Sequence, residues 1–233
     1  MFVGLGEFKA GKPHKMDGWG PILGDFGSGF QLAVDGFRFI GRSYDEGKRV
    51  QLFKQIRDWN NKRGKAPIRG ILHVQTWFDN LVRDPQNWRI RFAQLAEPIT
   101  QAADSPQPDP DAVKLVRTSA LDMAKTIEIA LQCFGERVTG LPIVFQGGMF
   151  EHSDLYRKTV ANKIRDRYAN KIRMATFRTV LGAALMGYTD VHGPLTESWA
   201  QTIRQSIRRL GSAEAMRVSY PDNLIEQLPA GGA

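Results

Sequence analysis

The most regular pattern of apolar and polar positions in the chain runs from Val113 to Phe134. Apolar side chains recur there every three or four residues, and Gly135 follows directly after the last of them. This spacing predicts one long amphipathic helix that is ended by the glycine. Residues 104–110, which precede it, contain three prolines and therefore predict an exposed connection.

Shorter helical patterns lie on both sides of this long segment, separated by stretches rich in glycine, asparagine and proline. The first of them is expected to break at residues 43–47, where the sequence reads SYDEG. We expect helices at residues 29–42, 48–59, 70–82, 87–103, 151–168, 180–188 and 197–210.

Strand-like runs occur near both ends of the helical block. Residues 2–8 and 14–19 flank a turn sequence, Ala-Gly-Lys-Pro, and together predict a hairpin. Residues 141–145 and 171–177 predict two further short strands. Strands and helices that are interspersed in this way are typical of the α/β class, and we expect a mixed sheet packed by helices.

The order of these elements also predicts how the chain is organised. We expect residues 1–233 to form a single domain. Within it, a helical block at about 48–136 is inserted between the hairpin at 2–19 and a strand–glycine–helix unit at 141–188.

The composition is that of a globular chain, since 42% of its 233 residues are hydrophobic. No run of 18 apolar residues occurs, and the one cysteine, Cys133, excludes an internal disulfide framework. We therefore expect a cytoplasmic protein with no membrane partner, in which Cys133 has an ordinary packing role.

The net charge of +8 is concentrated in part at residues 154–178, where eight Lys and Arg stand against two Asp. The favoured interpretation is a solvated basic helix face, and the alternative is a patch for a polyanion such as ATP or RNA. We expect no nucleic-acid partner, because no nucleic-acid-binding motif accompanies the charge. We also expect no metal site in the chain, because its four histidines share no metal-ligand spacing.

The first candidate site is the stretch MDGWGPILGDFGSGF at residues 16–30, which holds five glycines in fifteen residues. Glycines let the backbone approach a ligand closely, and Asp25 can accept hydrogen bonds from ligand hydroxyls. Trp19 offers a flat apolar wall of the kind that sugar sites use. A purely structural loop is the alternative interpretation.

The second candidate site is the stretch IVFQGGMFEHS at residues 143–153, a strand that runs into Gly147 and Gly148 before a helix. A glycine pair at this point lets a flat ring or a phosphate lie against the backbone. Together with the basic helix that follows, it predicts a nucleotide-binding edge.

The two segments together resemble a known family. Residues 18–29 are similar to the GWGxxxGDEGS signature of the N-acetylglucosamine kinase family. This family lies within the BadF/BadG/BcrA/BcrD-type ATPase group of the sugar kinase, heat-shock chaperone and actin superfamily. Residues 141–153 resemble its strand–GG–helix segment at the adenosine end of ATP, and the resemblance extends over about residues 2–188.

The resemblance implies a ribonuclease-H-like lobe of the actin-like ATPase fold with a helical insertion, here the C-terminal lobe without the N-terminal one. It also implies two ligands, an amino sugar and ATP, with Mg²⁺ on the phosphates. The residues implied to bind the amino sugar are Gly18, Trp19, Gly20 and Asp25. The residues implied to bind ATP are Ala93, Gly147, Gly148 and Ser153.

The sequence departs from the family in two respects. Phe26 stands where the family has an acidic residue after Asp25, which puts the identity of the sugar in doubt. The family's Asp-Gly-Gly-Gly-type and Gly-Thr-Gly-Ser-like phosphate loops and its general base have no counterpart in these 233 residues. We therefore name no catalytic residue, and we expect the chain alone to be inactive, with a separate N-terminal lobe or a second copy as possible partners.

Three functions are consistent with these observations. The first is ATP-dependent phosphorylation of an amino sugar such as N-acetylglucosamine or glucosamine. The second is a non-catalytic sugar- or nucleotide-binding module or a truncated fragment. The third is a reductase-activating ATPase, which is disfavoured because its iron–sulfur cluster needs two thiolates from each subunit and this chain offers only Cys133.

Overall fold

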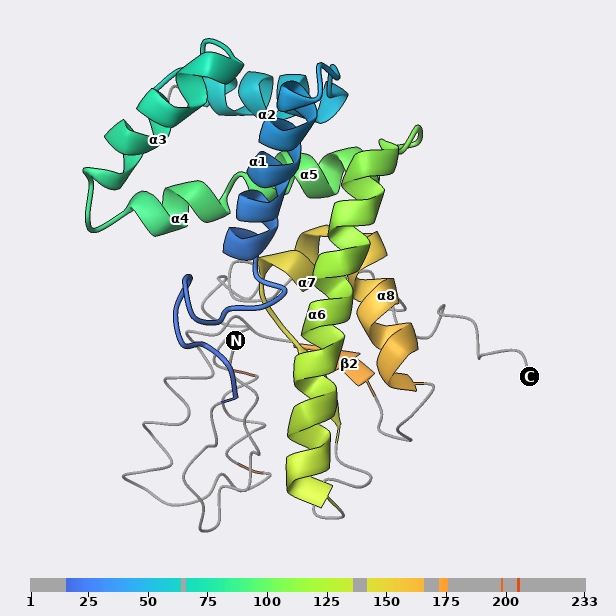
Figure 1. Ribbon diagram of the computed structural model, residues 1–233. Coiled ribbons are helices and arrows are strands. Elements are labelled where there is room, and N and C mark those ends of the chain that lie inside the picture. Colours follow the sequence, from blue (N-terminus) through green and yellow to red (C-terminus); the bar gives the residue numbers. More distant parts are fainter. Residues whose placement is uncertain are drawn as a thin grey trace.

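The computed structural model describes residues 16–63, 66–135, 142–165 and 172–175, together with the single positions 198 and 205. This part of the chain is mostly helical and contains one small sheet (Figure 1). The predicted strand at 2–8 and the predicted helices at 180–188 and 197–210 lie outside the described ranges, apart from those two positions. The organisation into a single domain stays a prediction.

The first helix, α1 (Gly29–Asp45), begins where the sequence predicts. The Ser28 hydroxyl oxygen accepts a hydrogen bond from the Gln31 N–H at 3.2 Å and so satisfies one of the free donors of the first turn. The expected break at residues 43–47 is only partly correct, because the helix continues to Asp45. Ser43 is buried on the core-facing side, so the packing of this last turn outweighs its weak helix preference.

The helical block contains α2 (Gln51–Lys62), a short 3₁₀ turn followed by α3 (Val74–Val82), α4 (Trp88–Ala93) and α5 (Ala96–Ala103). The single helix expected at 87–103 is thus divided into α4 and α5. In an unbroken helix the ring of Pro98 would clash with the Gln94 carbonyl oxygen, and the chain turns at residues 94–95 instead.

The predicted long helix is confirmed as α6 (Pro110–Phe134), and Gly135 caps its end with a positive φ of 57°. It begins three residues before the first position of the apolar pattern. Pro110 occupies the first turn, and the Asp109 carboxylate accepts hydrogen bonds from the N–H groups of Asp111 and Ala112 at 2.9 and 3.1 Å.

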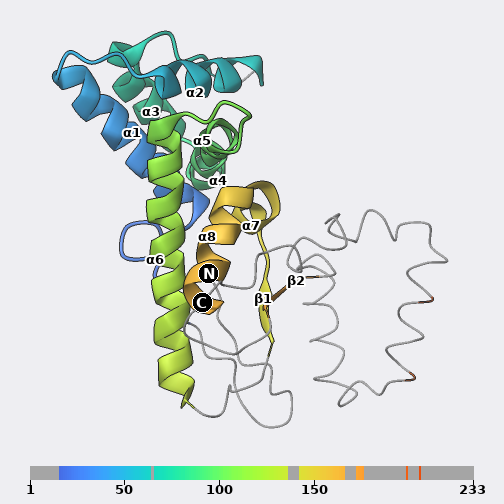
Figure 2. The same cartoon turned by 90° about the vertical axis from the view of Figure 1, so that its right-hand side faces the viewer.

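The second half of the described chain forms a strand–helix–strand unit. Strands β1 (Ile143–Phe145) and β2 (Ile172–Met174) pair in parallel, and α7 (Gly148–His152) and α8 (Asp154–Arg165) connect them. Figures 1 and 2 both show α8 lying beside α6. The expected strand–glycine–helix arrangement is confirmed, but the helix expected at 151–168 is divided at Ser153, whose backbone is extended.

Two expectations for the sheet change. Within the described ranges the sheet has two parallel strands, so the mixed sheet is confirmed only as a small parallel one. The second strand of the hairpin, expected at 14–19, is wrong for its described residues, 16–19. Asp17 and Gly18 have φ values of 60° and 72°, which an extended strand does not allow.

The core lies between the helices and contains a cluster of aromatic rings. The ring centroid of Phe92 on α4 lies 5.3 Å from those of both Phe30 on α1 and Phe78 on α3. These rings fix the helical block against α1, at whose N-terminal end the glycine-rich loop begins. The packing role expected for Cys133 is not observed, because this residue near the end of α6 is exposed.

Candidate functional site

The glycine-rich loop, residues 17–28, forms a series of tight turns before α1. Gly18, Gly20 and Gly27 have φ values of 72°, 92° and 73°, the left-handed region that favours glycine. The Gly24 N–H donates to the Gly20 carbonyl oxygen at 2.9 Å, and the Asp25 N–H donates to Asp17 Oδ1, also at 2.9 Å. The loop is therefore held closed by hydrogen bonds of its own.

One end of the loop is packed tightly against α6. A Cβ atom on Gly27 would lie 2.7 Å from Met123 Cβ and 2.9 Å from the Ser119 carbonyl oxygen. No side chain fits in this space, so the glycine at this position allows the loop to contact the helix directly.

A buried tyrosine on α8 fixes the same end of the loop. The Tyr156 hydroxyl donates to the Gly27 carbonyl oxygen at 2.6 Å. Burial, with a smaller contribution from the negative charge of Asp122, raises the pKa of this phenol far above its usual range. The hydroxyl thus remains protonated and able to donate.

The rest of the loop presents large side chains to solvent. Trp19 is 77% exposed and Phe26 is 52% exposed, and Ile22 and Leu23 are exposed as well. Asp25 lies between Leu23 and Phe26 in the sequence and is partly buried, with a φ of 59°. An exposed indole and a partly buried carboxylate in one loop offer stacking and hydrogen-bond acceptance, which are the two contacts that the sequence predicts for a sugar.

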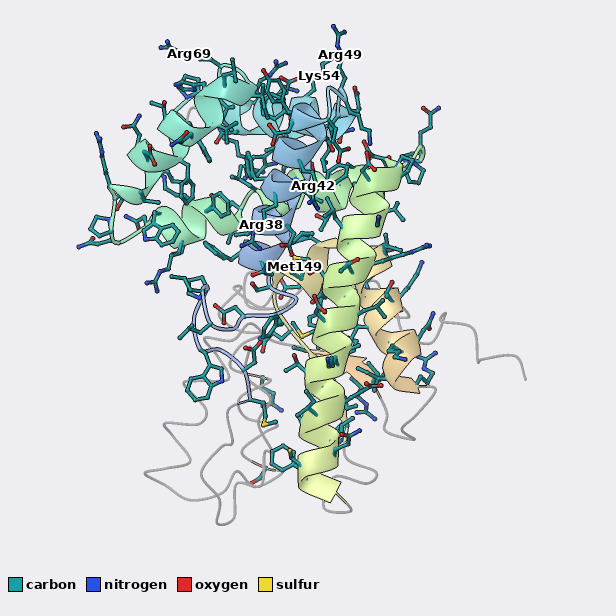
Figure 3. All side chains as sticks on the ribbon, in the orientation of Figure 1. Arg38, Arg42, Arg49, Lys54, Arg69 and Met149 are labelled. Carbon is teal, nitrogen blue, oxygen red and sulfur yellow. The ribbon has the colours of Figure 1, made fainter. Side chains whose placement is uncertain are left out.

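The start of α1 brings the loop close to the second candidate segment. A Cβ atom on Gly29 would lie 3.4 Å from both the Ala93 carbonyl oxygen and Ala96 Cβ, and 3.6 Å from Met149 Sδ. Met149 directly follows Gly148, and Figure 3 places it at the lower end of α1. The structure thus brings together the start of α1, the predicted ATP residue Ala93 and the side chain of Met149, the residue after the glycine pair.

The glycine pair has an open face. Gly147 has a φ of 106°, and a Cβ atom there would meet nothing within 4 Å. On Gly148 it would meet only His152 Cδ2, at 3.8 Å. The Gly147 N–H donates to Glu151 Oε1 at 3.1 Å, which fixes the turn. A flat group can therefore approach the backbone at both positions, as the sequence predicts.

Ser153 is completely buried, and its hydroxyl is engaged in the protein interior. The hydroxyl donates to Asp104 Oδ2 at 2.7 Å and accepts from the Tyr156 N–H at 3.2 Å. The Leu155 N–H donates to the other carboxylate oxygen of Asp104 at 2.8 Å. These bonds hold the start of α8 against the connection between α5 and α6, so that Ser153 has a clear structural role besides the ATP contact implied by the resemblance.

The basic run that begins at residue 154 is only partly a solvated face. Arg157 is 2% exposed, donates to the Phe150 carbonyl oxygen at 2.6 Å and forms an ion pair with Asp154. This guanidinium links α7 to α8 and is not available to a polyanion. Exposed cations also occur elsewhere, and Figure 3 labels several of them on α1 and the helical block: Arg38, Arg42, Arg49, Lys54 and Arg69.

The comparison with protein families decides the identity of this fold. Residues 5–187 match the family model described as the BadF/BadG/BcrA/BcrD ATPase family. The chain belongs to this ATPase family. The resemblance noted from the two glycine motifs is thereby confirmed, and membership implies ATP binding and the actin-like ATPase fold class.

A curated relative of this BadF/BadG-family chain is the N-acetyl-D-glucosamine kinase of Dictyostelium discoideum. The two sequences are 27% identical over 190 residues, which is 79% of this chain and 55% of the kinase. The chain therefore spans about half the length of the curated relative it matches.

Two kinds of feature are absent from the described ranges of this BadF/BadG-family chain. In the described ranges, no three His, Cys, Asp or Glu side chains are grouped so that they could hold a metal ion. None of the helices in those ranges has both the length and the apolar content needed to cross a lipid bilayer.

The sequence alone did not reveal three residues of this region, namely Asp17, Asp104 and Tyr156. An aspartate directly before the GWG turn was the only available signal for Asp17, because aspartate tolerates a left-handed backbone. Nothing in the sequence pairs Asp104 with Ser153, or Tyr156 with Gly27, since each pair is far apart along the chain.

Proposed function

We propose that this chain binds an amino sugar and ATP side by side and supports phosphoryl transfer from ATP to a sugar hydroxyl. The observation that carries the proposal is the close approach at Gly29. There the helix that follows the glycine-rich loop meets Ala93 and the residue after the Gly147–Gly148 pair. Two motifs about 120 residues apart in the sequence thus lie next to each other, as a two-substrate site requires.

In this proposal the glycine-rich loop is the sugar side of the site. Trp19 stacks on the apolar face of the ring, the Asp25 carboxylate accepts hydrogen bonds from its hydroxyls, and Gly18 and Gly20 allow close approach. N-acetylglucosamine and glucosamine are the preferred substrates. The exposed ring of Phe26 replaces a carboxylate of the family signature and favours a sugar that has an apolar substituent near this position.

The glycine pair is the nucleotide side. The open faces of Gly147 and Gly148 fit a flat adenine or ribose, and the Ala93 carbonyl oxygen and Met149 Sδ both lie beside Gly29 at the start of α1. Ser153 supports this side through its bonds to Asp104. Mg²⁺ would be held mainly by the ATP phosphates and water, as is usual for this ion.

The transfer step is an in-line attack of a sugar hydroxyl oxygen on the γ-phosphorus of ATP. The bond from the γ-phosphorus to the oxygen that bridges it to the β-phosphorus breaks, and the products are a sugar phosphate and ADP. The hydroxyl proton passes to a general base that none of the residues described above supplies. We therefore expect binding of both ligands to this chain, and transfer only when the family's phosphate loops and base are also present.

A ligand screen tests the proposal. Any ligand that binds the folded state raises the apparent stability, so we expect N-acetylglucosamine and ATP each to raise the melting temperature of the chain. Asp25→Ala is expected to weaken sugar binding by about 1–3 kcal/mol and to leave ATP binding unchanged. Asp45→Ala, at the exposed end of α1, is the control with the same change of charge.

The outcomes separate the competing functions. Binding of both ligands without phosphorylation by the chain supports the division of roles proposed above. Binding of ATP with no response to any amino sugar would contradict the sugar assignment and favour a non-catalytic nucleotide-binding module, since the single Cys133 still disfavours a reductase-activating ATPase. Phosphorylation of N-acetylglucosamine by the pure chain would show that the base and phosphate contacts are present after all.

A further inference from the structure

The glycine-rich loop contains two aspartates in an unusual backbone conformation. Within the described ranges, the non-glycine residues with a positive φ are Asp17, at 60°, and Asp25, at 59°. A left-handed backbone is costly for any residue with a Cβ atom, and such positions persist only where surrounding contacts hold them. Both of these lie in the candidate sugar loop.

A direct hydrogen bond connects the two aspartates. The Asp25 N–H donates to Asp17 Oδ1 at 2.9 Å, although eight positions separate them in the sequence. The chain between them is folded back on itself by the bond from the Gly24 N–H to the Gly20 carbonyl oxygen. The Asp17 carboxylate therefore closes the loop at the residue that carries the predicted sugar ligand.

The surroundings of this carboxylate are closely fitted. A Cβ atom on Gly24 would lie 2.5 Å from Asp17 Oδ1 and 3.0 Å from the Trp19 nitrogen, so only glycine leaves room for the carboxylate. The second oxygen, Asp17 Oδ2, is buried and has no hydrogen-bond partner among the described residues. The contact that orders the loop thus uses one oxygen atom, and this atom is also present in an asparagine.

We propose that Asp17 is a positioning residue for Asp25. Its Oδ1 atom fixes the backbone of Asp25 in the left-handed conformation and thereby holds the Asp25 carboxylate ready for the ligand. The inference rests on the proposed function, because it takes Asp25 to be a sugar ligand. It concerns a residue outside the GWG signature, which begins at Gly18.

Two substitutions separate the acceptor from the other properties of Asp17. Asp17→Gly removes the carboxylate without straining the backbone at its φ of 60°. Asp17→Asn keeps an oxygen acceptor and removes the charge. Asp45→Ala again serves as the control for a change of net charge.

The two readouts are the hydrogen-exchange rate of the Asp25 amide, measured by NMR, and the dissociation constant for N-acetylglucosamine. We expect Asp17→Gly to increase both by about tenfold or more, as the loss of one ordered hydrogen bond would do. Asp17→Asn should change each of them by less than about threefold, since it restores the acceptor.

An unchanged hydrogen-exchange rate of the Asp25 amide in Asp17→Gly would overturn the inference. Equal increases of the exchange rate and the dissociation constant in Asp17→Asn and Asp17→Gly would overturn it as well. The charge of Asp17, and not its hydrogen-bond acceptor, would then matter. If the unmodified chain binds no amino sugar, the proposed function fails, and the exchange rates by themselves decide whether Asp17 positions Asp25.

Discussion

The Tyr156 hydroxyl donates to the Gly27 carbonyl oxygen at 2.6 Å, across 129 positions of the sequence. This bond joins α8, in the strand–helix–strand unit, to the glycine-rich loop. It therefore connects the proposed nucleotide side of the site to the proposed sugar side. Both groups are buried, so water does not replace the bond when it is lost.

Tyr156→Phe removes this bond and leaves the Gly27 carbonyl oxygen buried without its donor. We expect the free energy of unfolding to fall by about 1–3 kcal/mol, the usual cost of an unsatisfied buried polar group. Urea denaturation measures the change. Tyr44→Phe, at an exposed position on α1, is the matched control and should have little effect. Equal stability of the two variants would contradict the role given to Tyr156.

The same phenol predicts a dependence of stability on pH. Burial raises the pKa of Tyr156 in the folded state, whereas in the unfolded chain it has the ordinary value of about 10. Its contribution is therefore fully present below pH about 10 and is lost as the pH rises further, because only the unfolded state then releases the proton. Above that pH, the stability of the unmodified chain should fall more steeply than that of Tyr156→Phe, by about 1.4 kcal/mol per pH unit. If the free energy of unfolding of the two proteins falls in parallel as the pH rises, the phenol is not protected by burial.

Two glycines with the same backbone conformation separate steric contact from backbone strain. Gly27 and Gly47 both have a φ of 73°, but a Cβ atom would meet Met123 Cβ at 2.7 Å on Gly27 and nothing within 4 Å on Gly47. We expect Gly47→Ala to cost about 1 kcal/mol from the left-handed backbone alone. Gly27→Ala should cost about 2–4 kcal/mol, because overpacking against α6 is added. Chemical denaturation of both variants tests this difference. Similar decreases in the free energy of unfolding would mean that α6 shifts easily to make room for the added Cβ atom.

The pair formed by Ser153 and Asp104 predicts coupled effects on stability. Ser153→Ala and Asp104→Ala each break the 2.7 Å hydrogen bond between them, and we expect each to cost about 1–2 kcal/mol. The double variant should lose less than the sum of the two, since the shared bond is lost only once. A double-mutant cycle by denaturation measures this coupling.

ATP titration of the same variants tests the contact implied for Ser153. A loss of ATP affinity in Ser153→Ala that Asp104→Ala does not share would indicate direct binding.

Local sequence signals predicted most of the helices, and their errors have local causes. The end of α6 was predicted because Gly135 acts on neighbouring residues, and the start of α1 lies where the helical pattern begins, after the N-cap Ser28. The helix expected at 87–103 is divided in the structure, because Pro98 interrupts a helix that the apolar pattern by itself predicts to be continuous. The strand expected at 14–19 was wrong for residues 16–19, since alternation of side chains does not reveal a left-handed backbone.

The candidate site was predictable in its parts and not in its assembly. The glycine-rich loop and the Gly147–Gly148 pair were both found from their composition, and the family comparison confirmed the resemblance that they carry. Which residues support them was not predictable. Nothing in the sequence singles out Tyr156, and it is the residue that holds Gly27.

The sequence by itself determined where α1 begins and α6 ends, that residues 16–30 contain a glycine-rich loop, and to which ATPase family the chain belongs. These properties depend on neighbouring residues or on a short motif, so the one-dimensional order contains them. Only the tertiary structure decided that Gly29 lies against Ala93 and Met149, that Asp104 holds Ser153, and that Asp17 holds Asp25. Each of these contacts depends on how separate segments pack in three dimensions, and many packings are compatible with the same local preferences.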